Sequence, residues 1–446
     1  MRKQWIALLL ALALCGIPVL AAGSRDQAPE NAESIQRTDT EAPLQETEES
    51  FEKAEAAEPS EKSEAPEPPA SPAGPDGEDA SELTPDPLGE VSFANMERRM
   101  REKNLQVLSL QHNVETLENY DYDELYEDLR NSLNSINQGQ YLLFQMGQGG
   151  SAAAELEQSY NAVEKQFEDL KKGKLQRTNA GTIRQLKNLQ DQIIMAGESM
   201  YTALVSMETQ EAALVRQLAA LDRTLEELAL RYKLGQISAL QLSEAKAGRS
   251  SLSSGLETLR MNIRVYKVQL ELMLGAEQTG NIKLGGVPAV TGAQLASMDL
   301  EADLAAAKKA SYELYAANQE LSDSYSPLSQ PGFAGNAAMA ARNSYQAAKY
   351  TYENTVQNYE LKFRTLYSQV NDNKQILDAA QVSLAFQEKT YASMELKYRQ
   401  GNISHNALLK AEDSLNEAKE AVRTASENLF ASYNSYRWAA EHGILN

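Results

Sequence analysis

The chain has 446 residues, of which 42% are hydrophobic, and a formal net charge of −21 at pH 7. Most of this charge lies in residues 24–90, which hold 20 Asp and Glu against 4 Lys and Arg, so that residues 91–446 carry only −7. A folded part with this balance has no basic stripe, and nucleic acid is excluded as an expected partner.

Residues 1–22 have the pattern of a secretory signal peptide. Two basic residues at 2–3 precede an apolar run over 5–14, and small residues at 21–23 offer a cleavage point. The apolar run is shorter than the about 20 residues that a membrane span needs. The single cysteine, Cys15, lies in this segment, and its lipidation is an alternative that the bulky residue before it disfavours. We therefore predict an exported protein of the cell envelope whose mature chain has no disulfide.

Residues 23–90 form an acidic segment rich in Glu, Ala, Pro and Ser, with ten of the 14 prolines of the chain. Such a segment has little apolar surface to bury, and its like charges repel one another. The composition predicts a disordered linker. It would serve either as a solvated spacer or as a tether that crosses cell-wall polymer.

Residues 91–446 are predicted to be all-α. They contain no proline before residue 288, and they are rich in the residues that favour helix. No convincing β-strand is visible, and no segment is apolar enough to be a transmembrane helix. In chain order, the predicted helices are 92–118, 122–147, 152–173, 182–233, 238–274, 293–323, 338–399 and 404–440.

Two of these helices carry apolar residues at heptad spacing, which is typical of coiled-coil seams. The first seam consists of Leu186, Ile193, Met200, Met207, Leu214, Leu221 and Leu228, with Leu204, Leu218, Leu225 and Tyr232 on a second track. The other seam consists of Val356, Phe363, Val370, Leu377, Leu384, Tyr391 and Tyr398. A helix over 182–233 would be about 78 Å long, so the pattern predicts long antiparallel helical hairpins.

The two seams belong to an internal duplication with an offset of 166 residues. Residues 231–245 align with 397–411 without gaps, and identities over nearly 30 residues indicate a repeat. The recurring residues of the first copy are Leu218, Thr224, Leu230, Tyr232, Gly235, Ile237, Ser238, Leu242 and Ala245.

The centre of each repeat is predicted to be a corner between two helices. A glycine in the left-handed conformation would end the first helix, and a serine would cap the next one. In the first copy, Ser238 and Gln241 form a capping box, and Ile237 and Leu242 a hydrophobic staple. None of these side chains carries chemistry. The corner residues are Tyr232, Gly235, Ile237, Ser238 and Leu242 in repeat one, and Tyr398, Gly401, Ile403, Ser404 and Leu408 in repeat two.

The repeated Tyr-x-x-Gly-x-Ile-Ser corner, between a heptad helix and a Leu/Ala-rich helix, resembles the repeat of the TolC-type outer-membrane efflux family. Gly275 and Gly443 match the usual close of each repeat. The resemblance covers 91–446, with repeat one at about 91–275 and repeat two at about 293–443. It implies a TolC-like α-barrel protomer, a homotrimer, an export conduit at the outer membrane, and a membrane-fusion adaptor of a pump as partner.

The sequence departs from that family where strands would interrupt each repeat, at 146–182 and 324–343. The first place is Gly-rich, then helical, then a short basic loop, and the second is a loop. Neither supplies strands of about ten residues. We therefore expect a relative without evident β-barrel strands.

No enzyme motif is present, and the expectation is a protein without catalytic residues, cofactor or metal. The histidines at 112, 405 and 442 are scattered. Five tyrosines on one helix, at 345, 350, 352, 359 and 367, suit either a seam or a channel or sugar-binding surface. The leading hypothesis is a conduit or scaffold of an efflux or secretion system. The alternatives are a secreted helical rod that binds or spaces cell-wall polymer and, less favoured, an adaptor-like pump subunit.

Overall fold

The computed structural model describes residues 86–87, 89–147, 150–329 and 335–445. The predicted signal peptide and residues 23–85 and 88 of the predicted linker lie outside this range. Described structure begins at Asp86, whose carboxylate accepts hydrogen bonds from the Ser92 amide at 3.2 Å and the Asn95 side chain at 2.8 Å.

The described chain is overwhelmingly helical, which confirms the predicted fold class. The elements are β1 (Glu90–Val91), η1 (Phe93–Asn95), α2 (Met96–Lys103), α3 (Leu105–Glu118), α4 (Tyr122–Gln145), α5 (Ser151–Lys171), α6 (Lys174–Lys233), α7 (Ala239–Met273), β2 (Lys283–Leu284), α8 (Gly292–Ala296), α9 (Leu300–Ala310), α10 (Tyr312–Tyr325), η2 (Ser326–Ser329), α11 (Gly335–Arg399) and α12 (His405–His442).

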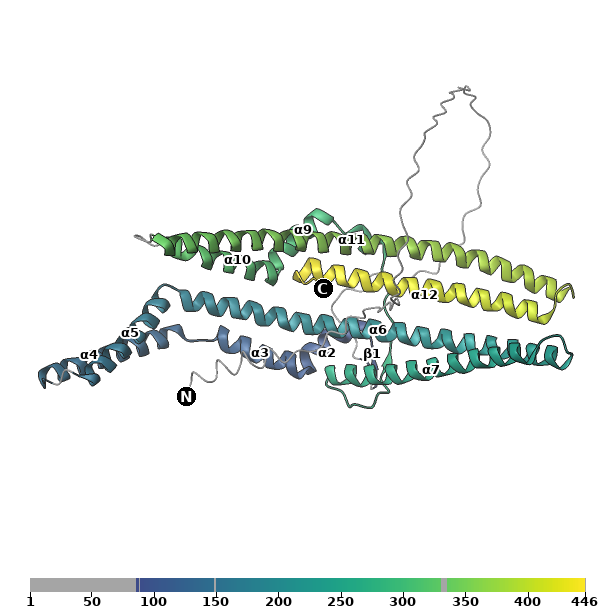
Figure 1. The fold of residues 1–446 in the computed structure, drawn as a ribbon, viewed down its shortest axis with the longest axis horizontal. Helices are drawn as coiled ribbons and strands as arrows, with labels where there is room; N and C mark the ends of the chain where they lie inside the picture. Colours follow the sequence, from purple (N-terminus) through teal and green to yellow (C-terminus); the bar gives the residue numbers. More distant parts are fainter. Residues whose placement is uncertain (1–85, 88, 148–149, 330–334, 446) are drawn as a thin grey trace, which may run out of the picture. The chain divides into compact units, whose positions relative to one another are not determined.

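Four long helices make up the body of residues 89–445 (Figure 1). Helix α6 packs against α7 on one side and α12 on the other, and α12 packs against α11, so the lateral order is α7–α6–α12–α11. With 60 residues, α6 is about 90 Å long, and α11, with 65 residues, is about 98 Å long. The predicted long antiparallel hairpins are therefore present, with α7 and α11 as the two edges.

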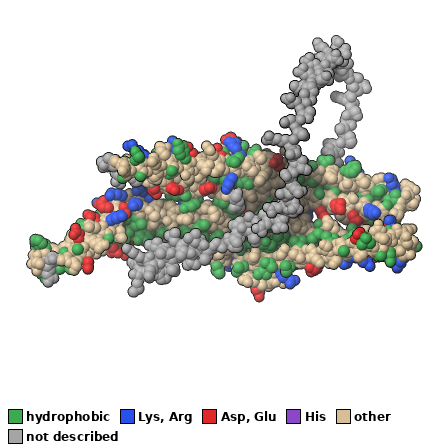
Figure 2. Space-filling view, in the orientation of Figure 1, with side chains coloured by type: hydrophobic (Ala, Val, Ile, Leu, Met, Phe, Trp, Pro, Cys, Tyr) green, Lys and Arg blue, Asp and Glu red, His purple; other side chains and the backbone are tan. Residues whose placement is uncertain are grey.

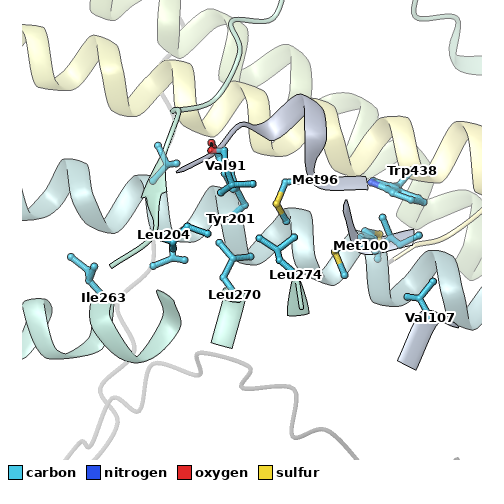
Figure 3. Packing of buried hydrophobic residues seen from close by; sticks show 14 of the residues in the cluster. Val91, Met96, Met100, Val107, Tyr201, Leu204, Ile263, Leu270, Leu274 and Trp438 are labelled. Carbon is cyan, nitrogen blue, oxygen red and sulfur yellow. Dashed lines mark hydrogen bonds between the residues drawn. The ribbon is translucent and has the colours of Figure 1, made fainter. Parts of the chain in front are cut away.

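The shorter helices cover the middle of this layer. Helices α2 and α3 pack on α6, α9 packs on α12, and α10 packs on α11. Two hydrophobic clusters result, one in each repeat. Figure 3 shows the first cluster, where Met96 and Met100 of α2 lie with Leu204 of α6 and Leu270 of α7. Trp438 of α12 reaches into it from the other repeat.

The heptad positions form the packed sides of the long helices. Leu204 on α6 and both Phe363 and Val370 on α11 are at most 1% exposed. Helix α7 follows the same spacing with three buried residues, Leu256, Ile263 and Leu270. Alignment at heptad spacing keeps one face of each helix against its neighbour along the whole length.

The predicted helix 92–118 is wrong in one respect, because Asn104 divides it into α2 and α3. The Asn104 side chain accepts hydrogen bonds from the amides of Gln106 and Val107 and donates to the Met273 carbonyl at 2.8 Å. The break thus caps α3 and also holds the last turn of α7.

The predicted helix 293–323 is likewise three helices, α8, α9 and α10. Residues 297–299 separate the first two, and Ser311 separates the others and caps α10 by accepting from the Leu314 amide. The Ser311 break lies against Gly443, at the end of α12. In both repeats, the break lies beside the end of a long helix. The α2–α3 break is beside the end of α7, and the α9–α10 break is beside the end of α12.

Two further expectations need correction. The segment before residue 182 is not a basic loop, because only Lys172 and Gly173, the latter in the left-handed conformation, separate α5 from α6. The described chain also contains two strands, β1 and β2, which pair in parallel over two residues each. Strands of this length are too short to leave a periodic pattern in a sequence.

Candidate functional site

The two corners share one hydrogen-bond arrangement. At the first, the Gly235 amide donates to the Tyr232 carbonyl at 2.9 Å and the Gln236 amide to the Arg231 carbonyl at 2.9 Å. At the second, Gly401 donates to Tyr398 at 2.8 Å and Asn402 to Lys397 at 2.9 Å. These are the paired bonds that close a helix on a left-handed glycine. The φ angles of the two glycines are +71° and +75°.

The serines of both corners cap the following helices. Ser238 accepts from the Gln241 amide, and the Gln241 side chain in turn accepts from the Ser238 amide at 3.0 Å. Ser404 accepts from the Ala407 amide at 3.2 Å. Half-buried apolar side chains flank each cap, and they are Ile237, Leu242, Ile403 and Leu408.

The corners expose apolar side chains to solvent. The most exposed are Leu230, Leu234 and Leu240 at the first corner and Leu396 at the second, each more than 55% exposed, with Tyr232 and Tyr398 about 40% exposed. The ten corner residues therefore belong to a surface where glycines and serines shape the turns and nearby leucine and tyrosine side chains are exposed to solvent.

The two edge helices carry apolar residues on the side away from their packed seams. We define the α7 stripe as Leu240, Met261, Val265 and Leu272, and the α11 stripe as Leu361, Ile376, Val382 and Phe386; every member is at least 50% exposed. At about 100° per residue, each stripe lies roughly opposite the buried seam of its own helix.

Some members of each stripe are related by heptad spacing. Leu361 and Val382 are three heptads apart, and Phe386 follows four residues later. On α7, Leu240 and Met261 are also three heptads apart, and Val265 again follows four residues later. At the heptad positions between them stand polar or small residues, Ser368 and Gln375 on α11 and Ala247 and Ser254 on α7, so each stripe is a discontinuous apolar track. Sequence reasoning missed the stripes because it searched for one seam per helix.

A buried carboxylate joins the two repeats between α6 and α12. Glu198, 2% exposed, accepts hydrogen bonds from Asn434 at 2.9 Å, Arg437 at 3.0 Å and the Trp438 indole at 2.7 Å. Nearer the corners, Arg223 of α6 pairs with Asp413 of α12 at 2.6 Å. No sequence motif marks Glu198, since its partners are more than 230 residues away along the chain.

A second polar junction connects α2, α6 and α12. Asp191 accepts from Arg101 at 3.1 Å and lies 3.2 Å from Nδ1 of His442. Burial of the Asp191 carboxyl opposes its ionisation, but the hydrogen bond and charge of His442, with Arg101, outweigh it and lower the pKa of Asp191. The hydrogen bond from Asp191 raises the pKa of His442 against the opposing effect of burial. Both groups favour their charged forms here.

The five tyrosines of α11 do not form one surface. Tyr359 is 1% exposed, and its hydroxyl donates to the carbonyls of Ala307 and Gly443 at 3.2 and 3.1 Å. Its burial raises the pKa of Tyr359 to about 12. Tyr350 is 66% exposed, and Tyr345, Tyr352 and Tyr367 are half-buried. Tyr359 therefore acts as a structural anchor at the end of α12.

Within the described ranges, no group of three or more His, Cys, Asp and Glu side chains could hold a metal ion. No helix among the described residues is long and apolar enough to span a membrane.

No family model matches this chain, and no curated protein matches its sequence. Solved structures do match. The outer-membrane channel OprN aligns with a TM-score of 0.50 at 13% identity, over 79% of this chain and 90% of that channel. The MtrE outer membrane channel of Neisseria gonorrhoeae aligns at 0.42 and 14% identity, over 78% and 89% of the two chains.

The outer membrane protein VceC of Vibrio cholerae aligns at a TM-score of 0.41 and 15% identity, over 60% of this chain and 76% of that one. The scores for MtrE and VceC fall under 0.5, so the comparison rests on OprN. At this identity, the likeness concerns the fold, and it agrees with the duplicated corner and the long hairpins described above. The chain has the fold of the TolC-type outer-membrane channels.

Proposed function

We propose that this protein is a non-enzymatic conduit or scaffold of an efflux or secretion system in the cell envelope. Copies of the chain associate side by side, with the α11 stripe of one copy against the α7 stripe of the next. The observation that carries the proposal is the exposed apolar stripe on each edge of the four-helix layer.

The geometry of such an association is head-to-tail, because two different surfaces meet. Repeated head-to-tail contacts close into a ring when the rotation between copies permits it. A ring of long parallel hairpins is a tube, and the TolC-type fold favours three copies. The stripes would place the contact along nearly all of α7 and along residues 361–386 of α11.

The corners are the proposed contact for a membrane-fusion adaptor. Leu230, Leu234 and Leu396 protrude at the ends of the hairpins, where an amphipathic helical partner could bury them. Hydrogen-bonded glycine corners with serine caps hold the helix ends that carry these side chains.

The proposal is tested by the mass of the full chain in solution. Val265→Glu and Phe386→Glu each place a charge in one stripe, and a buried unpaired charge opposes association. Light scattering after gel filtration should show an oligomer for the natural chain and monomers for both variants. Val215→Glu is the matched control, since Val215 is 41% exposed on α6, which is not an edge helix.

A natural chain that stays monomeric at tens of micromolar, or edge variants that keep the oligomeric mass, would contradict the conduit. Retention of a monomeric chain on purified peptidoglycan, abolished by deleting residues 24–90, would instead support a polymer-binding envelope rod.

A further inference from the structure

The α4–α5 hairpin is an addition to repeat one. Between α10 and α11, the described part of repeat two has only the short η2. Helices α4 and α5 pack on each other, with the Tyr126 and Phe167 rings 4.9 Å apart near the base. Figure 1 shows the hairpin extending beyond the start of α6, away from the two corners.

The tip of this hairpin is free of charge. Residues 131–154 contain no Asp, Glu, Lys or Arg, and this is the longest such run after residue 90. The second longest, 324–341, lies between α10 and α11. Since α6 and α11 both begin at this end and both finish at the corners, the described residues of the two runs, 131–147 with 150–154 and 324–329 with 335–341, lie at the same end of the helical layer.

The uncharged tip exposes large apolar side chains. Tyr141, Leu142, Phe144 and Met146 are 62%, 55%, 84% and 61% exposed. Figure 2 shows hydrophobic side chains gathered there, with acidic and basic ones nearer the base. At the corners, in contrast, charged residues such as Arg231, Lys233 and Arg399 stand beside the apolar ones.

The directions of these side chains identify the kind of partner. At about 100° per residue, Leu142 and Phe144 point to nearly opposite sides of α4, and Tyr141 lies between them. The remaining side of α4 faces α5. On that side, a Cβ added to Gly139 would lie 3.5 Å from the Leu156 side chain. A partner protein would cover one side of the helix, whereas the lipid of a bilayer can surround the end of a helical hairpin on all sides.

We propose that the α4–α5 tip inserts into the interface of a lipid bilayer. Insertion would be shallow, about 5–10 Å, as for other interfacial helices. Tyr141 suits the boundary, because its ring is apolar and its hydroxyl is polar. Exposed Tyr325 and Met339, which belong to the second uncharged run, would contribute from repeat two. The proposal goes beyond the conduit and does not require ring formation, since a single hairpin carries the tip.

The test is flotation of the full chain with vesicles of zwitterionic phosphatidylcholine. The tip variant Leu142→Ser, Phe144→Ser, Met146→Gln should bind on the order of 100-fold more weakly, because three apolar side chains lose their burial in lipid. The matched control Leu230→Ser, Leu234→Ser, Leu396→Ser removes three comparably exposed side chains at the corners and should bind like the natural chain. High salt should not weaken binding, since the tip carries no charge.

A site-specific probe separates the tip from the N-terminal apolar residues. In a Cys15→Ser background, a bimane label on Phe144→Cys should be quenched by brominated phosphatidylcholine, and one on Leu234→Cys should not. Equal binding of the tip and control variants, or equal quenching at the two positions, would overturn the proposal. So would a 144 label that responds only to oligomerisation, because the tip would then be a protein interface.

Discussion

At the scale of single residues, Glu198 is a buried side chain at the joint between the repeats. Three donors from α12 converge on its carboxylate. A buried charge is stable only when hydrogen bonds and an opposite charge replace its hydration. The partners come from the other repeat, so their pairing exists only in the folded chain.

We expect Glu198→Ala to lower the free energy of unfolding by about 3 kcal/mol, because it leaves the Arg437 charge and the Trp438 indole without their acceptor. Urea denaturation followed by circular dichroism measures the change. Glu353→Ala is the control, since Glu353 pairs with Lys349 on the surface at 3.8 Å, and a loss of about 0.5 kcal/mol or less is expected. Equal losses in the two variants would contradict the structural role of Glu198.

At the scale of elements, glycines at helix ends serve two different purposes. Gly401 has a φ of +75° and open space around it, so that it only closes a helix. Gly443 has a φ of +68°, and a Cβ there would come within 2.3 Å of the Ser311 amide nitrogen. The end of α12 thus needs glycine both for its conformation and for close approach of the break between α9 and α10.

Alanine at these two positions should give unequal effects. Gly401→Ala should cost about 1–2 kcal/mol, the strain of a side chain in the left-handed region. Gly443→Ala should cost about 3 kcal/mol or more, since backbone must also move in a packed place. Thermal and urea midpoints of the two variants check this, and similar values would show that the α12 end has room to relax.

The breaks at Asn104 and Ser311 show where prediction of helix bounds from the sequence reaches its limit. Long periodic segments such as α6 and α11 were predicted within a few residues at their corner ends, because the heptad pattern and the Gly-x-Ile-Ser stop are local signals. Both breaks lie in sequence that favours helix. They form because the ends of α7 and α12 pack there, which no local pattern encodes.

At the scale of the whole molecule, the two repeats meet through α6 and α12, and titratable groups lie at that contact. Asp191 and His442 stabilise the joint when both are charged. The lowered pKa of Asp191 gives stability that is present above its unfolded pKa, about 3.9, and is lost as pH falls. The raised pKa of His442 gives stability that is present below its unfolded pKa, about 6.5, and is lost as pH rises through the folded pKa.

The contribution of the pair should therefore be greatest between about pH 4 and pH 6.5. The natural chain should exceed His442→Gln in stability by the largest margin near pH 5.5, and the margin should shrink as pH rises from about 6.5 through the folded pKa of His442. Melting temperatures of both proteins across this range measure it. A margin independent of pH would show that packing of the His442 ring on Trp438, whose centroids lie 4.4 Å apart, is the whole contribution.

The sequence by itself determined the all-α class, the duplication, the corners and most helix ends, because heptad spacing, helix propensity and glycine–serine stops act between near neighbours in the chain. The sequence also contains the uncharged run of the α4–α5 tip and the apolar residues of the α7 and α11 stripes. Only the tertiary structure decided that α7 and α11 are edges with their apolar stripes exposed, that Glu198 and Asp191 join distant helices, and that the breaks fall at Asn104 and Ser311. Each of these depends on which helix lies beside which, a long-range arrangement fixed by burial across the whole fold.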